Sequence, residues 1–240
     1  MSGEAPGAPG SPFRDPRVNP ARWTPPRFPE DPRWGALLAV AAELRAVLDI
    51  LADTQADADT LEEAAGLVAR ARALLSRAPR GRRQWQLPEV AGELSRANFD
   101  DSPLSGLANP IAPPVRFRIG SDAVEGEVSF SRAYEGPPGH VHGGWIAATF
   151  DELLGVTQTL SGRAGVTGSL AVRYRRPVPL GRVARLRGWI DRVHGRRIHT
   201  RGELRSDGDV CAEGEAVFVV LDWERYRSLD GERGRGNRFS

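Results

Sequence analysis

Apolar residues recur at helical spacing in two blocks between residues 32 and 78. The first block begins after Asp31-Pro32, which has the form of a helix start, with an aspartate cap and a proline in the first turn. Its apolar positions follow one another at intervals of four and three, as one side of a helix requires. They are Leu37, Ala41, Leu44, Leu48 and Leu51.

The second block carries a similar stripe. Thr60 followed by Glu63 has the pattern of a capping box, and Pro79-Arg80-Gly81 is typical of a helix end. The stripe between them is Leu61, Ala65, Val68, Ala71 and Leu75. The two blocks predict a helical hairpin over residues 32–78. Its apolar stripes must be buried, either against each other, against the main domain or against a partner subunit.

After residue 110 the pattern changes to short alternating segments. Strands are expected at 115–119, 123–130, 166–176, 182–193, 197–206 and 210–221, with hairpin turns at Gly195 and Asp207-Gly208. In the strand at 166–176, strict alternation assigns Leu170, Val172 and Tyr174 to one face. It assigns the other face to Thr167, Ser169, Ala171, Arg173 and Arg175.

A single helix is expected from residue 143 to about residue 160, between the second and third strands. It is too apolar for an exposed helix, because it carries Ile146, Phe150, Leu153, Leu154, Val156 and Leu160. The sheet must therefore wrap around it. The expected fold is α+β, an antiparallel sheet around a central helix with an N-terminal helical hairpin.

This pattern divides the chain into four parts. Residues 1–30 are expected to form a flexible tail, and residues 31–104 the helical hairpin with its linker. Residues 105–222 form the main domain, and residues 223–240 a polar C-terminal tail.

Composition narrows the function classes. All 33 basic residues are arginine, which excludes Schiff-base chemistry and a lysine-bearing phosphate loop. The net charge is only +2, which gives weak support for nucleic acid binding. A single cysteine, Cys211, excludes an internal disulfide and fits a reducing compartment. No secretory signal is expected, because the N-terminal residues contain no basic stretch followed by an apolar core. No membrane span is expected, because Glu43, Arg45 and Asp49 interrupt the longest apolar stretch. We therefore expect a cytoplasmic protein.

The candidate chemistry lies at the start of the central helix. His142-Gly143-Gly144 opens this helix, so a ligand can approach backbone N–H groups that lack intrahelical acceptors. Such amides stabilise a developing oxyanion. Asp151 follows two turns later, beside the small residues Ala147, Ala148 and Gly155. A carboxylate on a largely buried helix indicates a partner or a catalytic role.

These residues resemble the PaaI-type branch of the hotdog acyl-CoA thioesterases. The resemblance covers about residues 105–222, not the hairpin, and rests on Asn109-Pro110, His142-Gly143-Gly144, Asp151, Val166-Thr167 and Arg176-Pro177-Val178-Pro179-Leu180-Gly181. It implies a hotdog fold and hydrolysis of acyl-CoA, with no cofactor. It also implies a homodimer or a dimer of dimers, since in this fold the carboxylate and the oxyanion donor commonly come from facing subunits.

The resemblance also implies residue roles. Asp151 would be the nucleophile or the general base, and Gly143, with Gly144 beside it, would supply the oxyanion N–H. His142 would fix the loop and touch the substrate carbonyl, and Thr167 would hold the attacking water or assist the acid. One departure is that Gly136-Pro137-Pro138 replaces an asparagine or glutamine that orients water in some members. Covalent and general-base mechanisms both stay open.

Purely structural alternatives accompany these roles. His142 as a backbone-bonding residue and Thr167 as an ordinary strand threonine are consistent with the pattern. Arg173, Arg175 and Arg176 are candidates for the phosphates of coenzyme A, or for a solvated strand face. His140 and His142 have no third ligand at suitable spacing, so no metal is expected.

Two rival functions remain. The first is a hotdog hydratase acting on enoyl-CoA. Hydratases of this type have a histidine about five residues after the catalytic aspartate, and Val156 at that position argues against this function. The second rival is a non-catalytic acyl-CoA-binding or assembly module, with the hairpin docking a partner.

Overall fold

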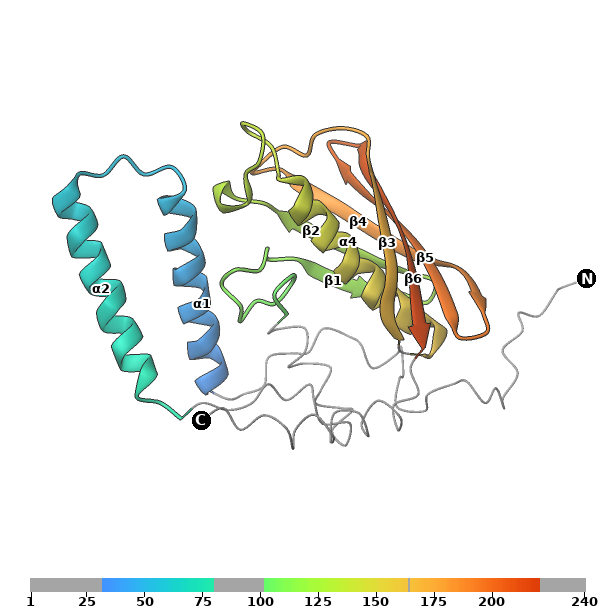
Figure 1. Ribbon diagram of the computed structural model, residues 1–240, viewed down its shortest axis with the longest axis horizontal. Helices are drawn as coiled ribbons and strands as arrows, with labels where there is room; N and C mark the ends of the chain where they lie inside the picture. Colours follow the sequence, from blue (N-terminus) through green and yellow to red (C-terminus); the bar gives the residue numbers. More distant parts are fainter. Residues whose placement is uncertain (1–31, 80–101, 164, 221–240) are drawn as a thin grey trace, which may run out of the picture.

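The computed structural model describes residues 32–79, 102–163 and 165–220 (Figure 1). The predicted tails and most of the linker before residue 102 lie outside these residues. The helical elements are α1 (Pro32–Leu51), α2 (Ala58–Ser76), η4 (Arg132–Tyr134), α4 (Gly143–Thr157) and η5 (Gln158–Ser161). The strands are β1 (Arg116–Ile119), β2 (Ala123–Ser129), β3 (Gly165–Tyr174), β4 (Val183–His194), β5 (Arg197–Ser206) and β6 (Asp209–Val220).

One antiparallel sheet holds all the described strands, in the order β1-β2-β4-β5-β6-β3. The predicted turns join β4, β5 and β6 as a meander, and Asp207 and Gly208 both have positive φ, as a tight hairpin favours. Strand β3 departs from the meander, because the chain crosses from α4 to the far edge and pairs β3 with β6.

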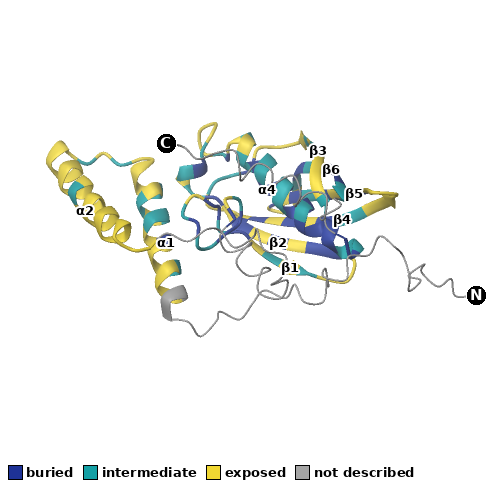
Figure 2. Cartoon of the chain, turned by 60° about the horizontal axis from the view of Figure 1, so that its bottom comes forward, coloured by how far each residue is buried: buried dark blue, intermediate teal, exposed yellow. Residues whose placement is uncertain are grey.

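Helix α4 lies against the concave face of the sheet, and the core forms where the two meet (Figures 1 and 2). A row of paired glycines, Gly188, Gly202 and Gly214, crosses β4, β5 and β6 beneath the helix. A Cβ at Gly214 would lie 2.4 Å from the Phe150 ring, so side chains here would push the helix away. The sheet therefore wraps closely around α4, which is the hotdog arrangement expected from the sequence.

Strand β3 contains a β-bulge that corrects the predicted facing of one residue. The register with β6 shifts between Thr167 and Ser169, so Thr167 pairs with the inward-facing Phe218. Strict alternation had assigned Thr167 to the outer face with Ser169, which was wrong. The extra residue in the bulge, Gly168, turns Thr167 toward α4.

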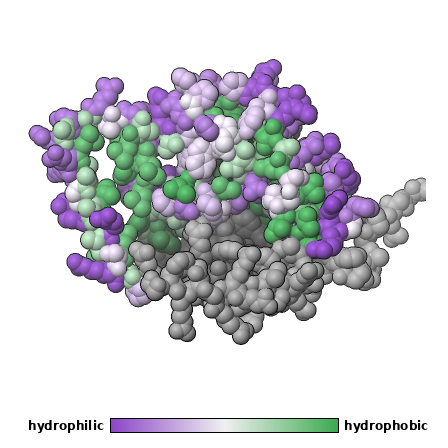
Figure 3. Space-filling view, in the orientation of Figure 1, coloured by the Kyte–Doolittle hydropathy of each residue, from purple (hydrophilic) through white to green (hydrophobic). Residues whose placement is uncertain are grey.

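The hairpin prediction is correct in its elements and wrong in one cap. Asp57, rather than Thr60, caps α2, and its Oδ1 accepts the Thr60 N–H at 2.8 Å. Helix α1 lies beside η4, whereas no residue of α2 is buried within the described part of the chain (Figure 2). Large apolar residues of both helices, such as Leu51 and Leu74, stay more than half exposed. Figure 3 shows apolar surface over both helices.

None of the described helices has the length and apolarity that a membrane crossing requires.

Candidate active site

A tight turn leads into the start of α4. The His140 N–H donates to Pro137 O at 2.9 Å, and Gly139, with φ of +74°, occupies the left-handed position of that turn. The Gly136 N–H donates to His140 O at 2.9 Å. A Cβ at Gly136 would lie 2.7 Å from the His142 Cα, so glycine lets the two arms of the turn approach each other.

His142 is the N-cap of α4. Its Nδ1 accepts the Gly144 N–H at 3.0 Å, and its own N–H donates to Tyr134 O at 2.9 Å. Because Nδ1 accepts, the ring proton of a neutral His142 belongs on Nε2, on an exposed side chain. The predicted loop-fixing contact is therefore present, and a donor faces outward beside it.

The Gly143 amide is the first N–H of α4. No acceptor for it lies among the residues that the structure describes. The hydroxyl of Tyr174, on β3, donates to Gly143 O at 2.9 Å, and the ring would lie 3.5 Å from a Cβ at Gly143. Tyr174 thus holds the carbonyl group of Gly143, which lies in the peptide bond after the candidate amide. The sequence pattern marked it only as a strand residue.

Asp151 lies on α4 opposite β3, and its side chain is half-buried. The Thr167 hydroxyl lies 3.0 Å from its Oδ1 and donates to it. This contact joins two of the predicted catalytic residues, and it depends on the bulge that turns Thr167 inward. A carboxylate oriented by a neighbouring hydroxyl is suited to accept a proton or to attack a carbonyl.

Glu152 is a half-buried carboxyl that the sequence pattern did not single out. The Ser105 hydroxyl donates to its Oε1 at 2.5 Å, and Ser102 also bonds it. Burial is the main cause that raises the pKa of Glu152, with a smaller contribution from the charge of Asp151. The signal for this site was Ser102 and Ser105 in the segment before β1, but only the packing shows that they meet Glu152.

The predicted phosphate-binding arginines lie at the far end of β3 from Thr167. Arg175 Nη2 lies 2.7 Å from Glu213 Oε2, and Arg176 forms an ion pair with Asp209. Arg173 stands opposite Glu213 in the sheet register. Among the described residues, no hydrogen bond or ion pair joins these side chains to Asp151. Within the same ranges, no cluster of potential ligands is arranged to hold a metal.

Comparisons with known proteins identify the family to which this domain is similar. A family model described as the thioesterase superfamily matches residues 138–213. The acyl-coenzyme A thioesterase THEM4 of Xenopus laevis is 35% identical over 89 residues, which are 36% of this chain and 40% of the relative. The acyl-coenzyme A thioesterase THEM5 of Homo sapiens is 30% identical over 92 residues, 38% of this chain and 37% of that relative.

A solved crystal structure of a thioesterase superfamily protein extends the likeness. It is 33% identical with a TM-score of 0.66, and the match covers 82% of this chain and 97% of that chain. Such a match reaches into the segment before residue 102, because residues 102–240 alone are a much smaller share of the chain. The chain belongs to the thioesterase superfamily, and its fold is that of the hotdog thioesterases.

The chain spans about two fifths of the length of the curated relatives it matches.

Proposed function

We propose that the protein is a thioesterase that hydrolyses acyl-CoA to the free acid and coenzyme A. The named relatives are acyl-coenzyme A thioesterases, and this chain carries the thioesterase superfamily domain. The observation that carries the proposal is the Asp151–Thr167 hydrogen bond on a helix whose first amide has no described acceptor.

In the proposed reaction, a water oxygen or the Asp151 carboxylate adds to the thioester carbonyl carbon. The negative charge that develops on the carbonyl oxygen is held by the Gly143 amide at the positive end of α4. The C–S bond then breaks, and coenzyme A leaves as a thiolate that takes up a proton. If Asp151 is the nucleophile, the acyl group stays on it as an anhydride, which a water molecule hydrolyses to release the free acid and restore the carboxylate. In the general-base form Asp151 takes the proton of the water, and Thr167 orients that water or the carboxylate.

The helix geometry favours a site shared between two copies of the chain. Asp151 and Gly143 are eight residues apart on one helix, so they lie roughly 12 Å apart along its axis at about 1.5 Å per residue. A single carbonyl group contacts both its attacking group and its oxyanion donor at about 3 Å. A homodimer, alone or as a dimer of dimers, would place the Gly143 amide of one protomer opposite Asp151 of its partner.

Several finer assignments are part of the same proposal. These are the PaaI-type branch, a cytoplasmic location, substrate contacts from His142 and Gly144, and phosphate contacts from Arg173, Arg175 and Arg176. The ion pairs of Arg175 and Arg176 favour the solvated-face alternative for those two side chains.

A thiol-release screen over short, medium, long and aromatic acyl-CoAs tests the proposal. We expect turnover of at least one class. Asp151→Asn keeps the shape of the side chain but removes its charge, so it should abolish turnover without unfolding the protein. Asp122→Asn, on an exposed turn, is the matched control. Full activity of Asp151→Asn would contradict the mechanism.

The same purified protein distinguishes the two rival functions, a hydratase and a non-catalytic binding module. Hydration of crotonyl-CoA without thiol release would favour a hydratase. Tight acyl-CoA binding by calorimetry with neither reaction would favour the binding module.

A further inference from the structure

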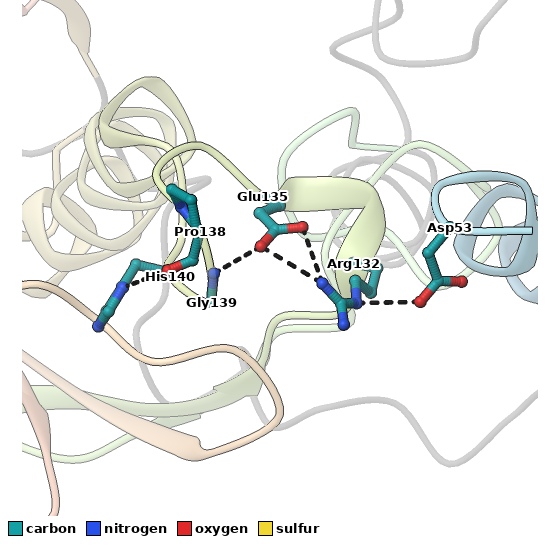
Figure 4. A network of polar contacts seen from close by, with 6 residues as sticks. All are labelled: Asp53, Arg132, Glu135, Pro138, Gly139 and His140. Atoms are coloured by element: carbon teal, nitrogen blue, oxygen red, sulfur yellow. Dashed lines mark hydrogen bonds and ion pairs between the residues drawn. The ribbon is translucent and has the colours of Figure 1, made fainter.

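Three charged side chains link the end of α1 to the loop before α4 (Figure 4). The Arg132 Nε lies 3.0 Å from Asp53 Oδ2, and its Nη1 lies 3.2 Å from Glu135 Oε2. The other oxygen of Glu135 accepts the Gly139 N–H at 2.5 Å. That amide, together with Arg132, lowers the pKa of Glu135, so its charge persists at neutral pH.

The Gly139 amide belongs to the turn that delivers His142 and Gly143. Glu135 reaches this turn twice, through its side chain and through a β-bridge between its backbone and Val141. The next residue, His142, caps α4. A shift of the turn would therefore move the first amide of the helix.

A second anchor fixes α1 beside this loop. The guanidinium of Arg45 donates to three carbonyl oxygens, those of Leu107, Asn109 and Ala112, at 3.3, 2.9 and 3.2 Å. The neighbouring Ile111 O accepts the hydroxyl of the buried Tyr134 at 3.4 Å. Arg132 begins η4 and Tyr134 ends it, so the Tyr134 hydrogen bond helps to hold η4 in place. The Arg45 contacts hold α1, and Asp53, just after the end of α1, meets Arg132.

We propose that Asp53, Arg132 and Glu135 are positioning residues that hold the Pro137–His140 turn, and with it the Gly143 amide, in the geometry that binds the oxyanion. This assigns the helical hairpin to the support of the active site, and it rests on the proposed function. Exposed ion pairs contribute little to the free energy of unfolding, so we assign these two a role in positioning the turn.

Steady-state kinetics on the acyl-CoA that the wild-type chain hydrolyses fastest tests the proposal. Arg132→Gln and Glu135→Ala should each lower kcat about tenfold with little change in KM or melting temperature, because small displacements of an oxyanion donor cost rate. Glu135→Gln keeps an oxygen for the Gly139 N–H and should lose less than Glu135→Ala. Asp53→Asn should lose less than Arg132→Gln, since it acts through Arg132.

A double variant separates a relay from independent effects. If Asp53 acts only through Arg132, then Asp53→Asn should have no further effect in the Arg132→Gln background. If the fold-losses in kcat of the two single variants multiply in the double variant, the proposal is wrong. Arg185→Gln is the matched control, because Arg185 pairs with Glu127 at 3.3 Å on an exposed part of the sheet and should leave kcat unchanged. An equal loss in this control would also overturn the proposal.

Amide hydrogen exchange gives a readout that needs no activity. Exchange at Gly139 should accelerate in Arg132→Gln and Glu135→Ala and stay unchanged in Arg185→Gln. If kcat and Gly139 exchange both match the wild type in Arg132→Gln, the positioning role is wrong. If the wild-type chain releases no thiol from any acyl-CoA, the proposed function fails, and unchanged exchange would then overturn the relay separately.

Discussion

The Thr167 hydroxyl donates a hydrogen bond to the Asp151 carboxylate at 3.0 Å, across the contact between β3 and α4. A one-residue bulge makes this contact, because without it Thr167 would share the outer face with Ser169. The candidate carboxylate therefore depends on an irregularity in an edge strand of the sheet.

The first prediction concerns this hydroxyl. Thr167→Val keeps the branched shape but leaves Asp151 without its donor. Hydrogen bonds to charged groups contribute about 1.5–3 kcal/mol, so kcat should fall about ten- to a hundredfold. Ser169→Val, two residues along on the outer face, is the control and should keep full activity. Equal rates of thiol release in both variants would exclude a catalytic role for Thr167.

Strict alternation could not have placed Thr167, because a bulge breaks the period of two on which that prediction rests. The sequence does contain the cause: Gly168 weakens the strand at that point. Whether a glycine produces a bulge depends on the partner strand, here β6, and pairing between residues so far apart is not visible in a local pattern. The helix start at Gly143 was predictable, because its signals are local.

The second prediction concerns the Gly143 amide. Gly143→Pro removes this N–H at a first-turn position that tolerates proline, and His142 before it has an extended ψ of 134° that proline accepts. The fold should persist while kcat falls by about 10²- to 10³-fold, the usual loss of an oxyanion donor. Gly143→Ala retains the N–H, and its Cβ would meet Tyr174 at an ordinary 3.5 Å, so it should keep most activity.

A mixing experiment tests the shared site directly. Each Asp151→Asn subunit keeps a working amide, and each Gly143→Pro subunit keeps a working carboxylate. If one active site combines both chains, subunit exchange between the two inactive proteins should restore about one quarter of wild-type activity, since half of the dimers are mixed and each has one intact site. No recovery, once mass spectrometry shows mixed dimers, would indicate that both groups act within one chain.

The third prediction concerns the glycine row beneath α4. A Cβ at Gly214 would lie 2.4 Å from Phe150, so Gly214→Ala should destabilise the fold by about 1–3 kcal/mol through overpacking. Gly155→Ala is the control, since a Cβ there would meet only Phe218 at 4.0 Å. That change should be neutral or stabilise α4 by about 0.5–1 kcal/mol. Urea unfolding measures both, and equal free energies of unfolding would contradict the close contact.

The fold class was predictable from the apolar helix, but this row was not. The three glycines lie on separate strands and become neighbours only through the register of β4, β5 and β6. The same reason hid Glu152, since its burial depends on Ser102 and Ser105 from a segment far away in the sequence. The position of the hairpin could not be predicted either. The apolar stripe of α1 does not indicate that Arg45 donates to backbone carbonyls of residues 107–112.

The last prediction concerns the pH dependence that Glu152 brings. Burial raises its pKa in the folded state above the ordinary value of 4.5, so the unfolded chain releases this proton at lower pH than the folded one. The stability that Glu152 contributes is therefore complete below about pH 4.5 and is lost as the pH rises through the folded-state pKa. Glu152→Gln stays neutral and keeps an oxygen for Ser105. Its free energy of unfolding relative to the wild type should thus rise between about pH 4.5 and neutrality. Parallel curves for Glu152→Gln and the wild type would contradict a raised pKa of Glu152 in the folded protein.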